Sequence, residues 1–310
     1  MSGLLSQEIA DYLAVRRSLG FQMARPEKLL PQLAAYLEQA GAATLTAEHA
    51  LAWAVLPGGS QTWHAYRLAV ARGFATWLAT TRPAAEIPPA GLIPARPRRA
   101  TPYLYTDEEV TALMAATESL DRRYPLRTAT YRTMVGLLAA TGMRVGEAIG
   151  LDRGDADLDS EVLTIRSGKN GKSRLVPLHP TTAQAIRGYL RDRDRLCPAP
   201  ARSQSLLISP PGSRLLACNV EATWRQLAAS AGLRPRSGNC RPRIHDLRHS
   251  FAVRTMLDAY ESGKDGQAVL AVLSTYLGHV NPKATYWYLT ASPELMAAAG
   301  RRLDAWLERP

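Results

Sequence analysis

Four separated segments of the chain carry side chains that together could attack a phosphodiester without a metal ion. They are residues 141–147 (TGMRVGE), 168–172 (GKNGK), 245–249 (HDLRH) and 277–279 (LGH), the last followed by YWY at 286–288. Paired arginines can stabilise the charge that develops on non-bridging phosphate oxygens, and a tyrosine can serve as covalent nucleophile. Histidine and lysine can transfer protons. Any one segment is weak evidence, because such side chains usually face water, but the combination favours phosphoryl transfer.

The third segment also permits a second interpretation, a helical zinc pair. His245 and His249 have the i, i+4 spacing of such a pair. However, Asp246 stands where the zinc-protease pattern has Glu, and Arg248 lies on nearly the same helix face as His245. The arginine charge would oppose a second cation, and no obvious third ligand follows at short spacing. We therefore expect no metal and no cofactor, with a zinc hydrolase as the rival.

The first 80 residues are predicted to be helical. Apolar residues recur at helical spacing in four stretches, near residues 5–13, 29–37, 47–56 and 61–80. The fourth carries one aromatic-rich stripe, which we interpret as core packing and which consists of Trp63, Arg67, Val70, Phe74 and Trp77.

The rest of the chain predicts a mainly helical domain with a small antiparallel sheet. Strands are expected at 162–166 and 174–178, joined by a turn at 167–173, and a short strand is possible at 206–209. Helices are expected near 106–117, 126–140, 181–195, 218–231, 244–258, 267–277, 283–290 and 292–307. The fold class is thus mainly α, with a helical N-terminal domain and an α+β C-terminal domain.

A proline-rich segment separates the two halves. Residues 81–102 contain six prolines, which block helix formation and predict an extended linker. We place the N-terminal domain at 1–82, the linker at 83–104 and the second domain at 105–310. Arg96, Arg98 and Arg99 in the linker could follow a DNA backbone, or could simply be solvated.

The composition is compatible with a nucleic-acid partner and an intracellular location. Lys and Arg total 38 against 27 Asp and Glu, a net charge of +11 that favours a polyanionic partner. The three cysteines are too widely spaced to predict a zinc site or a disulfide framework. There is no apolar run long enough for a membrane span and no export signal, so we expect a cytoplasmic protein.

The four segments resemble those of the tyrosine recombinase family, which includes phage integrases and Xer-type enzymes. They occur in the family's order and spacing across about 106–307, and the helical N-terminal region resembles its core DNA-binding domain. In this resemblance Arg144 matches the first catalytic arginine and Glu147 the supporting acid. Lys169 matches the hairpin lysine that protonates the leaving 5′ oxygen, with Lys172 in the same turn as the alternative.

The remaining segments also match residue by residue. His245 and Arg248 match the His-x-x-Arg pair, and His249 matches a supporting histidine. His279, in Leu-Gly-His, matches the position that hydrogen-bonds the phosphate, where some relatives have Trp.

Two tyrosines compete for the role of nucleophile. Tyr286 and Tyr288 are two residues apart and would face opposite sides of one helix. The family spacing places the nucleophile nine residues after the Leu-Gly-His histidine, and 279 + 9 = 288. Pro282 lies between His279 and Tyr288 and would start a new helix, so these two residues need not lie on opposite faces of one helix. We assign Tyr288, whose phenol needs a nearby proton acceptor or cations.

The resemblance implies a DNA recombinase that joins Tyr288 to a 3′ phosphate, frees a 5′-hydroxyl and needs no ATP. Its expected partner is double-stranded DNA, on which four identical or related protomers assemble at the nucleoid. The last helix could dock on a neighbour or on its own domain. Integration, excision or transposition of a mobile element would be its purpose. A type IB topoisomerase-like enzyme and an inactive DNA-binding protein are the alternatives.

Overall fold

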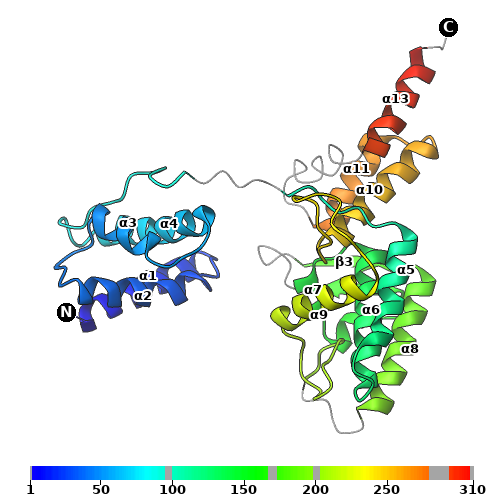
Figure 1. Cartoon of the computed structure of the whole chain (residues 1–310), viewed down its shortest axis with the longest axis horizontal. Helices are drawn as coiled ribbons and strands as arrows, with labels where there is room; N and C mark the ends of the chain where they lie inside the picture. Colours follow the sequence, from blue (N-terminus) through cyan, green and yellow to red (C-terminus); the bar gives the residue numbers. More distant parts are fainter. Residues whose placement is uncertain (1, 95–99, 167–172, 198–202, 279–292, 308–310) are drawn as a thin grey trace. The chain divides into compact units, whose positions relative to one another are not determined.

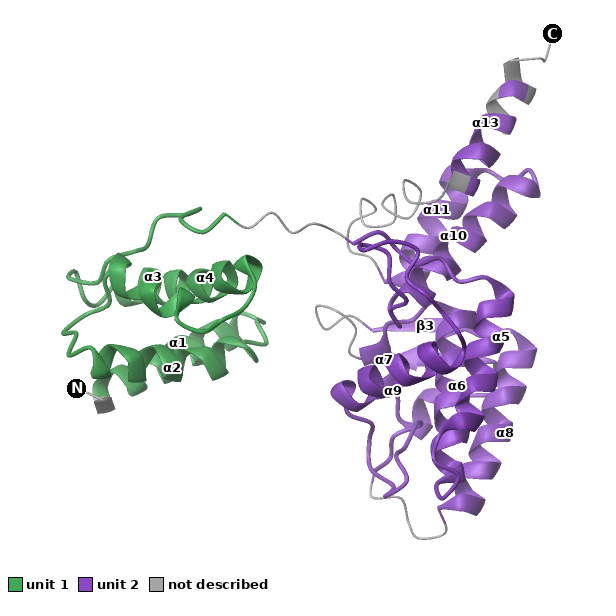
Figure 2. Ribbon diagram, in the orientation of Figure 1, with its two compact units in different colours: residues 1–99 green, residues 100–310 purple. Residues whose placement is uncertain are grey.

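The protein consists of two compact units. The computed structural model describes residues 2–94, 100–166, 173–197, 203–278 and 293–307. One unit comprises Met1–Arg99 and the other Ala100–Pro310 (Figure 2). Helices predominate in both, and a small antiparallel sheet lies in the second (Figure 1), which confirms the predicted fold class. None of the described helices is long and apolar enough to cross a membrane.

The N-terminal unit is built from the helices that the apolar spacing predicts. They are α1 (Ser2–Ser18), α2 (Pro26–Gln39), α3 (Ala47–Val55) and α4 (Gln61–Leu78). Thr46 and Ser60 cap the starts of α3 and α4 with their hydroxyls. Phe74 is fully buried, and Arg67 stacks over Trp53 with its guanidinium carbon 3.8 Å from the ring centroid. The stripe on α4 therefore packs in the core, as expected.

Much of the segment expected as a linker packs against one unit or the other. The backbone N–H of Glu86 donates to the carbonyl of Leu45 at 2.9 Å, and Arg72 donates to the carbonyl of Pro88 at 2.9 Å. Further along, Tyr103 is buried in the second unit. By its internal contacts, the chain divides between Arg99 and Ala100.

The C-terminal unit is organised around one long central helix. This helix, α6 (Pro125–Thr141), packs against α5 (Asp107–Ala116) and α8 (Pro180–Leu196). Thr106 and Glu109 form a capping box at the start of α5. Helix α9 (Ala217–Ser230) packs on α5 and closes the core.

The small sheet contains the two predicted strands and one additional strand. β1 (Ala156–Asp157), β2 (Val162–Ile165) and β3 (Arg174–Pro177) pair antiparallel in sequence order. Ile165 lies opposite Arg174 at the end of the hairpin. The strand considered for 206–209 is absent; within that segment only Ile208 pairs, in a single isolated bridge with Arg214. The short helix α7 (Val145–Gly150) was not predicted.

A second cluster of apolar residues joins the last helices. Helices α10 (Asp246–Glu261), α11 (Gly266–Leu277) and α13 (Pro293–Leu307) contribute to it, with Met256, Leu273 and Leu295 buried at its centre. Helix α10 also packs on α6, which connects the cluster to the main core. The helix expected near 283–290 lies outside the described residues.

The turn between α6 and α7 requires glycine. Gly142 ends α6 in the left-handed conformation with φ of +58°, which residues with a Cβ atom adopt at a cost. A Cβ atom there would lie 2.5 Å from the Phe251 ring on α10. The absence of a side chain at Gly142 thus lets the end of α6 pack closely against Phe251 on α10.

We expect Gly142→Ala to lower the free energy of unfolding by about 2–5 kcal/mol, from left-handed strain plus overpacking. Gly150→Ala is the matched control, because a Cβ at Gly150 meets nothing within 4 Å. Urea unfolding of both variants measures the difference. A loss of only about 1–2 kcal/mol would mean that Phe251 moves aside and left-handed strain alone remains, and equal stability of the two variants would contradict both causes.

Candidate active site

Arg144 stands at the junction between the Gly142 turn and helix α7. It is the residue that precedes α7, in an extended conformation, and its side chain is 23% exposed. Its backbone N–H donates to Glu147 Oε2 at 2.9 Å, and its guanidinium donates to Glu147 Oε1 at 2.7 Å. These two bonds fix the direction of the Arg144 side chain from both ends.

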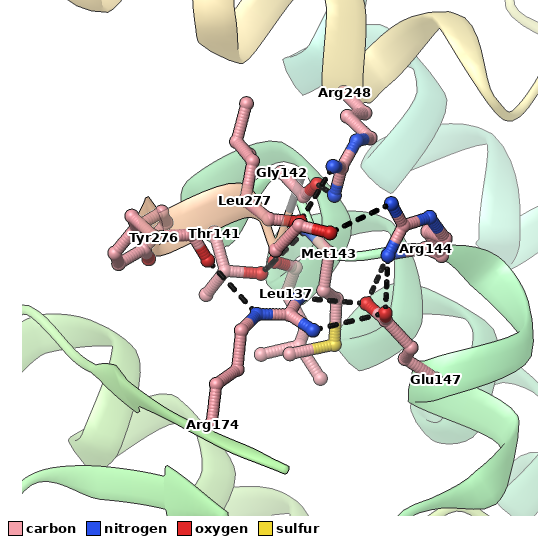
Figure 3. Close-up of polar contacts among 11 residues, drawn as sticks. Leu137, Thr141, Gly142, Met143, Arg144, Glu147, Arg174, Arg248, Tyr276 and Leu277 are labelled. Atoms are coloured by element: carbon pink, nitrogen blue, oxygen red, sulfur yellow. Dashed lines mark hydrogen bonds and ion pairs between the residues drawn. The ribbon is translucent and has the colours of Figure 1, made fainter. Parts of the chain in front are cut away.

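A second arginine holds the same carboxylate. Arg174, the first residue of β3, donates to Glu147 Oε1 at 3.0 Å and to Oε2 at 2.8 Å (Figure 3). The Glu147 side chain is only 5% exposed and Arg174 only 14%. Glu147 therefore lies between two guanidiniums and has both oxygens bonded, as a buried carboxylate requires.

The electrostatics of this cluster follow from the contacts. Burial alone would raise the pKa of Glu147, but hydrogen bonds from Arg174 and from the Arg144 backbone outweigh it and lower the pKa to about 2. Glu147 is consequently ionised at neutral pH, and it acts as a fixed negative charge rather than as a proton donor.

The carbonyl end of α11 is bound by three arginines. Arg174 Nε donates to Tyr276 O at 2.9 Å, Arg248 donates to Leu277 O at 2.7 Å, and Arg144 donates to Gly278 O at 3.4 Å (Figure 3). The last carbonyls of a helix lack partners within it and carry partial negative charge, so cations stabilise them. Three successive carbonyls thus bring three guanidiniums together.

Arg248 is fixed from the opposite side as well. It lies in the first turn of α10, is only 2% exposed, and donates to the carbonyl of Gly142 at 2.8 Å. One guanidinium therefore spans from the α6–α7 turn to the end of α11.

His245 immediately precedes α10 and keeps an exposed face. The surrounding atoms still desolvate its ring, and this effect, followed by the charge of Arg248, lowers its pKa below 6.5, with Asp246 opposing. The His249 ring packs edge-on against it, with centroids 5.4 Å apart. His245 is accordingly a neutral imidazole near pH 7, which can accept a proton.

Asp246 anchors the start of α10. Its carboxylate is fully buried and accepts two hydrogen bonds from Arg243, both 2.9 Å long. It also accepts the backbone N–H of Tyr103 at 3.2 Å, and Ser250 accepts that of Tyr105 at 2.7 Å. The first residues of the C-terminal unit are thereby tied to the turn that carries His245.

The structure brings together those predicted site residues that it describes. Arg144, Glu147, His245, Arg248 and His249 all lie around the ends of α6, α10 and α11. Outside the described residues lie Arg96, Arg98, Arg99, Lys169, Lys172, His279, Tyr286 and Tyr288. Within the described segments, no three His, Cys, Asp or Glu side chains gather in a way that could hold a metal ion.

Sequence reasoning overlooked Arg174. The sequence did contain a signal: Arg174 and Val176 are two residues apart and therefore lie on the same face of β3, and Val176 is buried. An arginine on the buried face of a strand needs a carboxylate partner. Its partner could not be identified from sequence, since Glu147 is 27 residues away and no local pattern connects the two.

Known proteins resemble this chain along most of its length. The sequence model of the phage integrase family matches residues 104–294. A putative integrase/recombinase, y4rB of Sinorhizobium fredii, is 44% identical over 98% of each chain. The tyrosine recombinase XerC of Mycobacterium tuberculosis is 29% identical over 79% of this chain and 78% of the relative.

Solved structures share the fold. The Tn1549 transposon integrase, solved in complex with transposon right-end DNA, has a TM-score of 0.64 at 16% identity. The match covers 96% of this chain and 98% of that one.

The depressed pKa of Glu147 predicts a pH dependence of stability. Because its folded pKa of about 2 lies below the ordinary 4.5, its contribution is present above pH 4.5 and is lost as the pH falls toward 2. Urea unfolding at pH 6 and pH 3.5 should therefore show a smaller loss for Glu147→Gln than for the native protein. An equal loss in both would mean that Glu147 is not strongly paired.

Proposed function

Because this chain belongs to the phage integrase family of tyrosine recombinases, we propose that it is a site-specific recombinase that cuts and rejoins double-stranded DNA through a 3′-phosphotyrosyl intermediate. The observation that carries the proposal is the convergence of Arg144 and Arg248 on the end of α11, next to the neutral His245.

Arg144 and Arg248 would stabilise the scissile phosphate. Arg144 is the more exposed of the two and can bond a non-bridging oxygen directly. Arg248 is buried, and its charge acts at short range in surroundings that screen it less than water does. Both are already oriented by backbone carbonyls, so they need little rearrangement when negative charge develops at the phosphorus.

Tyr288 is the proposed nucleophile. Its oxygen attacks the phosphorus, the bond to the 5′ oxygen breaks, and a 3′-phosphotyrosyl link forms. The phenol proton passes to His245, and the leaving 5′ oxygen takes a proton from Lys169 or Lys172. A 5′-hydroxyl from a partner strand then reverses these steps, so no ATP is consumed. Partly buried Tyr276, whose pKa is raised to about 12 by desolvation, is a poor nucleophile at neutral pH.

The proposed biological role is integration, excision or transposition of a mobile element. Support comes from the names of the similar proteins, an integrase/recombinase and a transposon integrase. The net charge of +11 favours binding to the DNA backbone. Arg96, Arg98 and Arg99 would contribute to it as contacts in the linker.

Exchange between two duplexes requires four protomers, and α13 is the proposed contact between them. Leu295 and Ala298 are buried against their own unit, whereas Met296 on the same helix is 64% exposed. Helix α13 could thus pack on its own domain with one face and on a neighbour with the other.

For the nucleophile, we expect Tyr288→Phe to bind DNA but form no covalent complex, while Tyr286→Phe still forms it. Native protein and variants would be incubated with nicked duplexes from DNA flanking the gene, and protein-linked DNA resolved on denaturing gels. A covalent band with Tyr288→Phe would overturn the assignment.

For assembly, Met296→Asp should leave the thermal midpoint nearly unchanged but reduce tetramer formation on DNA, because it puts a charge into an apolar contact. Leu216→Asp is the control, as Leu216 is 61% exposed on another element. Gel-shift stoichiometry distinguishes them, and undiminished tetramers with Met296→Asp would restrict α13 to its own protomer.

A further inference from the structure

Arg174 makes contacts that no phosphate-binding role explains. Its side chain donates three hydrogen bonds to protein groups, two to Glu147 and one to the carbonyl of Tyr276, and its backbone lies opposite Ile165 in the hairpin. Its side chain is 14% exposed, less than the 23% of Arg144. Figure 3 shows its guanidinium between Glu147 and the chain at Tyr276.

We propose that Arg174 is a positioning residue for DNA cleavage, which orients Arg144 through Glu147 and fixes the end of α11 through the carbonyl of Tyr276. This inference rests on the proposed function, in which Arg144 stabilises the scissile phosphate.

The route to Arg144 is electrostatic and geometric. Each carboxylate oxygen of Glu147 accepts one hydrogen bond from the Arg174 guanidinium and one from Arg144. The Arg144 donor is its guanidinium for Oε1 and its backbone N–H for Oε2. Without Arg174, the carboxylate would keep only the bonds from Arg144 and could draw that guanidinium inward as its sole counter-charge. With Arg174 in place, two of the four hydrogen bonds to Glu147 come from Arg174. Arg144 therefore keeps N–H donors that can bind a phosphate.

The route to α11 depends on close packing. Gly278 follows α11 in the left-handed conformation, and a Cβ atom there would lie 3.1 Å from the Arg174 guanidinium. The backbone at Gly278 thus rests against Arg174 while its carbonyl accepts from Arg144. Arg174 therefore contacts the described end of α11 through both the Tyr276 carbonyl and the backbone of Gly278.

The choice of variant must separate position from charge. Arg174→Lys keeps the positive charge but loses the planar fork that bonds both oxygens of Glu147 and the Tyr276 carbonyl together. Arg153→Lys is the matched control, because Arg153 makes a similar two-bond contact to Asp194 on the exposed surface of the same unit.

The experiment compares cleavage of two substrates by these proteins. One is a nicked duplex carrying the site at which the native protein becomes covalently trapped, and the other has an uncharged methylphosphonate at the scissile position. Outer-shell partners that orient a reactive group are worth about 10–100-fold in activity at metal sites, and we expect a loss in this range for Arg174→Lys on the phosphodiester. DNA affinity should change less than about threefold, since a lost phosphate contact would cost more.

The methylphosphonate decides the mechanism. It lacks one negative oxygen and depends less on a correctly aimed Arg144, so the loss caused by Arg174→Lys should shrink relative to native protein. Arg153→Lys should match native protein on both substrates. An equal loss on both substrates, or a loss confined to DNA affinity, would overturn the proposal.

A second readout does not depend on DNA chemistry. The loss of stability between pH 6 and pH 3.5 that is due to Glu147 should be smaller in Arg174→Lys than in native protein, because the pairing of Glu147 is weakened. An unchanged acid loss would contradict the contact on which the inference depends. Failure of the native protein to form a covalent complex, by contrast, would count against the proposed function.

Discussion

The carbonyl end of α11 is the constraint on which the site depends. A helix end inside a protein leaves carbonyls that need donors. Here the donors are Arg174, Arg248 and Arg144, on three successive carbonyls. Each arginine comes from a different element, so the helix end fixes the relative positions of β3, α10 and the α6–α7 turn. The same contacts that satisfy the backbone therefore assemble the cationic site.

This arrangement requires glycine at the ends of two helices. Gly142 and Gly278 end α6 and α11 in left-handed conformations, and each faces a neighbour at very short distance. Because both glycines allow the backbone to approach closely, Arg248 can span from the Gly142 carbonyl to that of Leu277. The apolar spacing predicted helices near 126–140 and 267–277, which end close to these glycines, but no sequence pattern indicated that one arginine joins the two ends.

Local sequence patterns predicted most helices and strands, but they could not predict hydrogen bonds between residues far apart in the sequence. The capping box at Thr106, the helix that ends at Gly142 and the hairpin are all visible in the sequence, since their causes lie within a few residues. Several bonds that organise the site join residues far apart in the sequence, from 27 positions between Glu147 and Arg174 to 145 between Tyr105 and Ser250. Only resemblance to a family could indicate Arg144 and Arg248; it was silent on Arg174.

The charges of the cluster explain why a third arginine is useful. Arg144, Arg174 and Arg248 carry +3 and Glu147 carries −1, which leaves +3 − 1 = +2 at neutral pH. Without Glu147, the like charges of the buried Arg248 and the partly buried Arg144 and Arg174 would repel. Without Arg174, the carboxylate would neutralise Arg144 alone. Glu147 pairs chiefly with the less exposed Arg174, so the positive charge that Glu147 neutralises is mainly that of Arg174. The uncompensated charge is then left on the two arginines that the family resemblance assigns to the phosphate.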